Sequence, residues 1–358
     1  MNIDDIINSI DSNNLDIAFG RVVNISAVTL SAVGLDVAVG DIVRIESAQK
    51  LYTVLGMVTV LKDGLFVIVP FSFIDGFKIN DKVFLQRDGL TVKCGNGLLG
   101  RVVNALGDPI DDLGKIRDLD TNAPINKESM SPLDRGIIDK KFATGVKAID
   151  SMLTCGKGQK VGIFAGSGVG KSTLMGMIVQ GCEATIKVIA LVGERGREIP
   201  EFIHYNLNNN LENTVIVTAT SDESPLMRKY AAFTAMTIAE YFRDKGYDVL
   251  LMMDSVTRFA MAQREIGLST GEPPVSRGYP PSVFALLPQL MERAGNSKKG
   301  SITAFFTVLV DGDDLNDPIA DQSRSILDGH IVLTRDLTEQ GFYPPINILK
   351  SASRVIDK

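Results

Sequence analysis

The feature that most limits how this chain can fold is a glycine-rich segment, residues 165–173, between an apolar run and a helical pattern. It reads Ala-Gly-Ser-Gly-Val-Gly-Lys-Ser-Thr, follows the apolar run 160–164 and opens the helical pattern 171–181. Apart from its initial alanine it matches the phosphate-binding loop, in which glycines let backbone N–H groups surround phosphate oxygens at a helix N-terminus. A glycine-rich turn with a solvated lysine would not require a strand before it and a helix after it. The segment therefore predicts a strand–loop–helix unit that binds the phosphates of a nucleotide.

Two side chains of this loop are expected to carry chemistry. The Lys171 ammonium is suited to contact the β- and γ-phosphates, and the Ser172 hydroxyl is suited to ligate Mg²⁺. The residues expected to contact the nucleotide are Gly166, Ser167, Gly168, Val169, Gly170, Lys171, Ser172 and Thr173.

The chain that follows alternates between strand and helix patterns. Apolar strands that alternate with helices are typical of a parallel sheet covered on both faces, which predicts an α/β nucleotide-binding architecture. A stretch rich in Pro, Asp and Gly, residues 107–136, precedes the alternation and is expected to be a long surface connector. Beyond 160–164 and 171–181, the strand patterns are 187–192, 214–218, 249–253 and 301–309, and the helical patterns are 199–207 and 226–245.

Two carboxylates follow strands of this predicted sheet. Glu194 comes after the run 187–192, and Asp254 comes directly after the run 249–253. The carboxyl ends of neighbouring parallel strands share one crevice, so both side chains can face the phosphates. We expect Glu194 to orient the attacking water as the catalytic base and Asp254 to hold Mg²⁺ through water. A helix-capping role for Glu194 or Glu198 is the alternative.

The first 90 residues contain short β-rich runs separated by Gly, Asp and Asn, which predict a small β-barrel at 16–89. The runs are 18–28, 41–45, 52–61, 65–69 and 82–85. Aromatic residues of this barrel could stack nucleic-acid bases, but its seven basic and eight acidic residues provide no positive surface for a nucleic acid. We therefore expect its aromatics to pack in the core, among them Tyr52, Phe66, Phe71 and Phe73.

The N-terminal residues 1–15 form a separate pattern. Ile3, Ile6, Ile7 and Ile10 recur at helical spacing before a polar segment, which predicts a short amphipathic helix. Its apolar face could dock on its own domain or bind a regulatory partner, and spacing does not distinguish these.

Composition excludes several classes of protein. With 45% apolar and 22% charged residues, the 358-residue chain is expected to be globular, and it has no run long enough to span a membrane. Its three cysteines, Cys94, Cys155 and Cys182, never occur in a C-x-x-C spacing, so neither a disulfide framework nor a thiolate zinc site is indicated. This cysteine usage suits a reducing, cytoplasmic compartment. Only His204 and His330 are present, so carboxylates, lysines and arginines must carry the chemistry.

Longer stretches make the chain similar to a known family. The sequence resembles the ATPase of the bacterial flagellar type III protein export apparatus, whose relatives are injectisome export ATPases and, further off, the catalytic subunits of rotary ATP synthases. The resemblance runs from the barrel to the last residue. It is carried by 100–111 (Gly-Arg-Val-Val-Asn-Ala-Leu-Gly-Asp-Pro-Ile-Asp), 145–150, 165–173, 193–198 (Gly-Glu-Arg-Gly-Arg-Glu), 254–265, 273–287, 325–330, 344–347 and 351–354.

The resemblance implies an α/β fold in which a RecA-like, parallel-sheet P-loop ATPase domain, residues 90–358, follows the barrel. It implies ATP and Mg²⁺ at the site, and it adds two residues that spacing does not reveal. Arg354 matches the arginine finger that reaches the γ-phosphate in the neighbouring subunit, and Tyr343 matches the aromatic that stacks on adenine. Without the family, a surface ion pair and a turn tyrosine would be the simpler interpretations.

The resemblance also implies partners. They are a homo-hexameric ring of the full-length protein, a stator-like regulator at the N-terminal helix, export-gate membrane proteins, a central stalk protein and export chaperone–substrate complexes. The enzyme is expected in the cytoplasm, peripherally associated with the inner-membrane flagellar export gate, where hydrolysis is coupled to delivery and unfolding of export substrates. Family members continue beyond Arg354 into a helical C-terminal domain, whereas this chain stops at Lys358. We therefore expect the chain to lack that domain and to be mostly monomeric.

An injectisome ATPase and a rotary ATP synthase catalytic subunit remain alternatives, because the same motifs serve all three. Ala165 and the block 273–281 favour export over the rotary subunit. A ring-shaped RNA translocase is disfavoured by the near-neutral barrel and the net charge of −6, so no nucleic-acid partner is expected. A non-catalytic nucleotide-binding scaffold is disfavoured by the carboxylate at Glu194.

Overall fold

The computed structural model describes residues 18–48, 52–310, 314 and 316–355. Contacts divide the chain into two compact units, Met1–Gly89 and Leu90–Lys358. The predicted N-terminal helix and its isoleucine face lie outside the described residues. Within the described part of the chain, no helix is long and apolar enough to cross a membrane.

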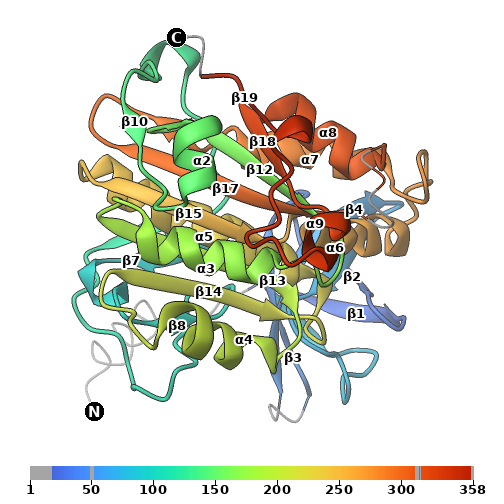
Figure 1. Ribbon diagram of the computed structural model, residues 1–358. Helices are drawn as coiled ribbons and strands as arrows, with labels where there is room; N and C mark the ends of the chain where they lie inside the picture. The colour runs from blue at the N-terminus through green and yellow to red at the C-terminus, as the bar shows by residue number, and fades with distance from the viewer. Residues whose placement is uncertain (1–17, 49–51, 311–313, 315, 356–358) are drawn as a thin grey trace. The chain divides into compact units, whose positions relative to one another are not determined.

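The first unit contains a closed six-stranded barrel whose strands pair in the order β1-β2-β5-β4-β3-β6. Its strands are drawn in shades of blue in Figure 1. Neighbouring strands are antiparallel, and pairing of β1 with β6 closes the barrel. Alternate side chains such as Val22, Leu30, Val43 and Ile68 fill the interior. The strands are β1 (Phe19–Ile25), β2 (Leu30–Val33), β3 (Ile42–Glu46), β4 (Thr53–Lys62), β5 (Leu65–Pro70) and β6 (Lys82–Gln86).

The prediction that the barrel aromatics pack in the core is correct for Phe66 and Phe71 and wrong for Tyr52 and Phe73. Phe66 and Phe71 are 2% and 4% exposed, whereas Tyr52 and Phe73 are 53% and 67% exposed. Tyr52 immediately precedes β4 and Phe73 follows β5, so neither takes part in the inward-outward alternation of a strand.

The second unit is built on a nine-stranded sheet with the order β19-β18-β12-β17-β15-β13-β14-β8, to which β16 adds beside β17. Strands from β18 to β8 along this path are parallel, and β19 and β16 are antiparallel to their neighbours. The central strands are buried almost throughout. The strands are β8 (Val102–Val103), β12 (Lys160–Ala165), β13 (Ile186–Glu194), β14 (Thr214–Thr220), β15 (Asp248–Asp254), β16 (Gly295–Asn296), β17 (Ser301–Leu309), β18 (Gly329–Val332) and β19 (Ala352–Ser353).

Helices cover both faces of this sheet, as the rule of right-handed crossovers requires. The connection from β12 to β13 runs in one direction across the sheet, and those from β14 to β15 and from β15 to β17 run in the other. Accordingly α3 contacts the π-helix on one face, while α5, α6, α7 and α8 contact one another in sequence; α2 and α3 lie in front of the sheet in Figure 1. The helices are α2 (Lys147–Met152), α3 (Lys171–Gly181), α4 (Glu198–Glu201), the π-helix η3 (Phe202–Asn206), α5 (Pro225–Asp244), α6 (Val256–Ser269), α7 (Pro281–Met291), α8 (Pro318–Ile326) and α9 (Arg335–Glu339).

The segment 107–136, predicted as a surface connector, is mostly exposed but contains regular structure. Its strand β9 (Thr121–Pro124) pairs antiparallel with β7 (Thr91–Cys94). This pairing joins residues 27 to 33 positions apart, from Cys94 with Thr121 to Thr91 with Pro124, so a local pattern could not predict it. The remaining short elements are η1 (Asn96–Leu98), η2 (Pro132–Asp134), β10 (Lys141–Phe142), β11 (Cys155–Gly156) and η5 (Ile348–Lys350).

Candidate nucleotide-binding site

The glycine-rich loop connects the end of β12 to the start of α3. Gly168 and Gly170 adopt φ angles of 77° and 89°, in the left-handed region that residues with a Cβ rarely enter. Gly170 is also confined by packing, because a Cβ there would lie 3.3 Å from Tyr343 Cε1. Glycines thus allow the chain to turn from the strand into the helix within a few residues, and α3 begins at Lys171.

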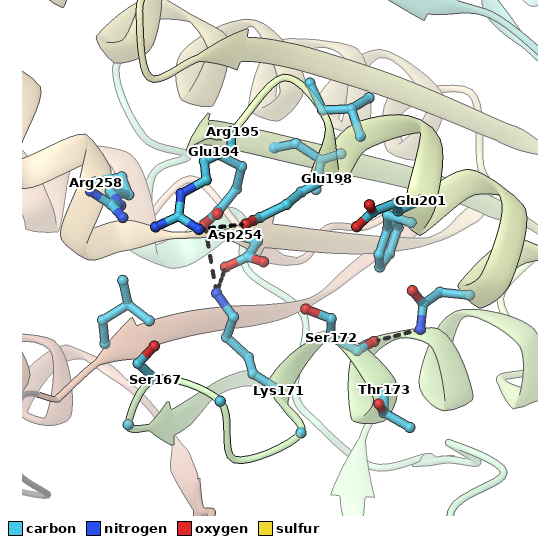
Figure 2. A pocket seen from close by; sticks show the side chains of 18 residues that line it. Ser167, Lys171, Ser172, Thr173, Glu194, Arg195, Glu198, Glu201, Asp254 and Arg258 are labelled. Carbon is cyan, nitrogen blue, oxygen red and sulfur yellow. Dashed lines mark hydrogen bonds and ion pairs between the residues drawn. The ribbon is translucent and has the colours of Figure 1, made fainter.

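A cavity of about 670 Å³ opens where β12, β13 and β15 end (Figure 2). The phosphate loop forms one side, and Glu194 and Asp254, at the ends of β13 and β15, lie opposite it. The volume of the cavity is within the range typical of small-molecule sites. The cavity also lies at the carboxyl edge of a parallel sheet, which is where such folds bind ligands. Of the predicted site residues, the lining includes Gly166, Ser167, Gly168, Gly170, Lys171, Ser172, Thr173, Glu194 and Asp254; Val169 is buried beneath it.

Lys171 stands between the two carboxylates. Its Nζ lies 2.5 Å from Asp254 Oδ1 and 3.6 Å from Glu194 Oε1. The three side chains are only 13%, 6% and 14% exposed, so water screens their charges weakly. The structure therefore brings together the three charged residues that the sequence predicts, from three separate elements.

Burial and charge shift the protonation of this cluster. Burial, together with the negative charge of Asp254, raises the pKa of Glu194 to about 7, although Lys171 acts in the opposite direction. Burial lowers the pKa of Lys171, but the charges of Asp254 and Glu194 outweigh it and hold the pKa above its usual value. Among the described residues, the buried Glu194 Oε1 has no hydrogen-bond partner, which leaves an acceptor available to a ligand or water.

The oxygen donors at this edge suit Mg²⁺. Asp254 Oδ1 accepts a hydrogen bond of 2.7 Å from Thr307 Oγ1 on the neighbouring strand β17, which fixes the carboxylate, and the exposed Ser172 lies across the cavity (Figure 2). The described residues contain no cluster of three or more His, Cys, Asp or Glu that could hold a metal alone. This fits Mg²⁺, which usually takes one or two protein ligands together with waters and substrate phosphates.

Tyr343 lies beside the phosphate loop, because its Cε1 atom would be 3.3 Å from a Cβ at Gly170, and the residue is 60% exposed. Arg335, from α9, reinforces this neighbourhood by donating from Nη2 to the carbonyl oxygen of Ser167 over 3.3 Å. The C-terminal segment therefore packs against the outer side of the loop.

Arg354 does not line this cavity. Its backbone N–H donates to the carbonyl of Asp328, and Asp328 N–H donates to the carbonyl of Lys160, at the start of β12. Arg354 is exposed and lies level with the amino end of β12, whereas the phosphate loop follows the carboxyl end. The side chain is therefore not part of the site formed by its own chain.

Sequence reasoning missed several residues at the site. Thr307 was visible only as a hydroxyl within the apolar run 301–309. Arg258, which lines the cavity, follows Asp254 by four residues and lies in the first turn of α6. The Ser255 hydroxyl caps α6 by accepting a hydrogen bond of 3.2 Å from the N–H of Arg258. Asn206 had no sequence signal, because it reaches the cavity only through the π-helix.

A phosphate loop beside a lysine and two carboxylates at the edge of a parallel sheet defines a P-loop nucleotide-binding protein. The nucleotide-binding domain of the ATP synthase alpha/beta family matches residues 145–353. The chain is 62% identical to the Flagellum-specific ATP synthase of Helicobacter pylori strain J99 over 94% of this chain and 77% of that protein, and 49% identical to that of Bacillus subtilis over the same shares. The assembled ATPase EscN from the enteropathogenic E. coli type III secretion system superposes with a TM-score of 0.89 at 47% identity, over 94% of this chain and 81% of EscN.

The chain therefore belongs to the ATP synthase alpha/beta family, in the branch of flagellum-specific and type III secretion ATPases, and it is an ATPase. This confirms the family resemblance, the barrel followed by a parallel-sheet P-loop domain, and the class of enzyme that the sequence predicts.

Proposed function

We propose that this chain hydrolyses Mg-ATP to drive flagellar type III protein export. The observation that carries the proposal is the buried cluster in which Lys171 lies between Asp254 and Glu194 beside the phosphate loop. The flagellar role is supported by the flagellum-specific relatives, which reach 62% identity, against 46% to 54% for the type III secretion ATPases.

The loop residues bind the triphosphate through backbone N–H groups. Lys171 gives up its ion pairs with the two carboxylates and contacts phosphate oxygens instead. Ser172 and Asp254 hold Mg²⁺, which neutralises charge on the phosphates when bound. Tyr343 stacks on the adenine from the outer side of the loop. These assignments use side chains that line the cavity or border the loop.

Glu194 orients and polarises the attacking water. It ends a buried strand, faces Lys171 across the cavity and carries an acceptor oxygen with no hydrogen-bond partner among the described residues. A pKa of about 7 suits a general base that works near neutral pH.

Arg354 acts on a neighbouring subunit. An arginine at the amino edge of its own sheet is available to a second copy of the chain, and an arginine finger supplied in trans stabilises charge in the transition state. We propose a homo-hexameric ring on this basis, supported by the assembled EscN. EscN has also been solved in complex with its central stalk EscO, and a comparable stalk protein is a proposed partner here.

The wider setting is proposed from the family resemblance of the sequence. We propose that the enzyme works in the cytoplasm at the membrane-embedded export gate, with a stator-like regulator at residues 1–15 and chaperone–substrate complexes as clients. Hydrolysis would supply the work of delivering and unfolding those clients.

The test of Glu194 compares hydrolysis with binding. Glu194→Gln is expected to lower phosphate release at least about 100-fold while Mg-ATP affinity, measured by calorimetry, changes less than about threefold, because the carboxylate acts on water rather than on phosphate. Turnover within a few-fold of the unmodified chain contradicts the assignment.

Two further variants make the comparison specific. Glu212→Gln changes an exposed glutamate that precedes the amino end of β14 and is not part of the cavity lining, and it is expected to leave both measurements unchanged. Lys171→Ala is expected to weaken binding itself, because the ammonium contacts phosphate in the ground state as well as in the transition state.

A further inference from the structure

A second cavity, of about 580 Å³, lies in the ATPase unit away from the nucleotide site. The segment 126–129 forms one side, and helices α5 and α7 form the rest. Phe233 and Leu286 supply apolar lining, while Lys127, Glu128 and Lys229 supply the charged groups. The volume is sufficient for a small organic molecule.

Lys229 is the unusual residue of this cavity. It projects from α5, is only partly exposed, and its Nζ lies 5.5 Å from the centroid of the Tyr230 ring. None of the ion pairs that the structure shows among the described residues involves Lys229, whereas Lys127 lies 3.9 Å from Asp244 and the buried Arg293 pairs with Glu240. A partly buried amine without an ion-pair partner loses the interaction that normally keeps a lysine charged, and the face of the Tyr230 ring offsets only part of that loss.

The charged groups that line this cavity come from the segment 126–129 and from α5. The segment 126–129 contributes Lys127 and Glu128, α5 contributes Lys229 and the neighbouring Tyr230, and the lining from α7 is uncharged. Burial lowers the pKa of Lys229 to about 8, and no neighbouring charge contributes appreciably. Near neutral pH about a tenth of such amines are neutral, against about 0.03% of ordinary lysines.

We propose that Lys229 is an acyl-accepting amine and that this cavity is a modification site for small activated acyl donors, either acyl phosphates or acyl thioesters. The lone pair of the neutral amine attacks the acyl carbonyl carbon and a C–N bond forms. The C–O bond to phosphate or the C–S bond to the thiol breaks, the leaving group departs with the bonding electrons, and the nitrogen releases its proton to water. The product is an amide, which removes the positive charge from the cavity.

The proposal is tested on the native chain by measuring acetylation of each lysine with quantitative peptide mass spectrometry, from pH 6.5 to 9.5. Acetyl phosphate and acetyl-coenzyme A are used in separate arms. At pH 7, Lys229 is expected to react at least tenfold faster than the exposed Lys299, which serves as the internal control, and its rate is expected to level off above about pH 8. Selectivity in either arm supports the site and identifies the donor class.

Two controls separate the site from general reactivity. In urea, where the cavity is lost, Lys229 and Lys299 are expected to react at similar rates. The variant Lys229→Arg is expected to lose this adduct while other lysines keep their rates. A native Lys229 that reacts no faster than Lys299 in both arms, or whose rate still rises tenfold per pH unit above pH 9, overturns the proposal.

Discussion

At the scale of single residues, the nucleotide site depends on the carboxylate of Glu194, whose surroundings disfavour its charged form. Glu194 is held near Asp254 and Lys171, and burial with the adjacent negative charge raises its pKa to about 7. A carboxyl group with such a pKa is protonated in a large fraction of molecules below neutral pH. The fraction of Glu194 that is ionised and can act as a base therefore depends on pH in the physiological range.

This protonation predicts the pH dependence of hydrolysis. Because the ionised form of Glu194 is the active base and its folded pKa lies near 7, kcat/KM for Mg-ATP should rise about tenfold per pH unit below pH 7 and level off above it. Steady-state phosphate release from pH 5.5 to 8.5 measures the profile. A flat profile across this range would exclude Glu194 as the titrating base.

Stability provides an independent check of the same shift. The folded state binds a proton at Glu194 more tightly than the unfolded state, because the pKa is about 7 in the folded state and near 4.5 in the unfolded state. The contribution of Glu194 to the free energy of unfolding therefore falls as the pH rises from about 4.5 to 7. The melting temperature of Glu194→Gln minus that of the unmodified chain should therefore increase as the pH is raised from 5 to 8. An unchanged difference between the two proteins would show that the pKa is ordinary.

At the scale of elements, the phosphate-loop helix is held by the π-helix. Asn206 Nδ2 donates to the carbonyl of Ser172 over 3.1 Å, and Gln180 Nε2 donates to the carbonyl of Asn206 over 2.5 Å. Gly176 makes this approach possible, since a Cβ there would lie 2.8 Å from Asn206 Cβ and 3.1 Å from its carbonyl oxygen. The contact links the segment after Glu194 to the helix that carries Ser172.

Gly176→Ala tests this contact. Alanine is favoured over glycine within a helix by about 1 kcal/mol, so an uncrowded site would gain stability. Here the methyl group meets Asn206, and we expect the free energy of unfolding to fall by about 1–3 kcal/mol, with weaker Mg-ATP binding. Urea unfolding and calorimetry measure the two effects.

Gly196→Ala is the control for this variant, because its Cβ would lie 3.9 Å from the nearest atom and its backbone is not left-handed. Its unfolding free energy should change by less than about 0.5 kcal/mol. Equal effects of the two substitutions would mean that Asn206 does not restrict α3.

At the scale of the whole molecule, the placement of Arg354 ties activity to assembly. The residue is exposed at the amino edge of the sheet, away from the cavity of its own chain. Arg354→Ala should therefore leave nucleotide affinity within about twofold in dilute protein, but lower hydrolysis by about 10³- to 10⁵-fold where subunits associate. Specific activity measured against protein concentration, beside sedimentation velocity, distinguishes the two regimes.

Lys350→Ala provides the matched control, since Lys350 is exposed in the same C-terminal segment. The specific activity of Lys350→Ala should depend on protein concentration in the same way as that of the unmodified chain. A loss of activity in Arg354→Ala that is independent of protein concentration would refute action in trans.

The sequence alone determined the features that depend on local pattern. The five central strands of the sheet, the phosphate loop at Lys171 and the positions of Glu194 and Asp254 at strand ends follow from short apolar runs and glycine spacing. Helices α6, α7 and α8 are not among the predicted patterns. Helix α3 begins and ends where its pattern predicts, whereas the barrel strand β2 lies outside the predicted runs, because the run 18–28 extends into the turn that precedes β2. Parallel strands bring their carboxyl ends to one edge, so a local pattern sufficed to predict that these residues share a crevice.

Only the tertiary structure decided what depends on contacts between distant segments. The pairing of Lys171 with Asp254, the support from Thr307, the exposure of Tyr52 and the cavity at Lys229 each arise where separate elements meet. The burial that shifts the pKa of Glu194 likewise comes from several strands at once. Desolvation and packing are summed over all neighbours in space, and a sequence pattern records only the neighbours along the chain.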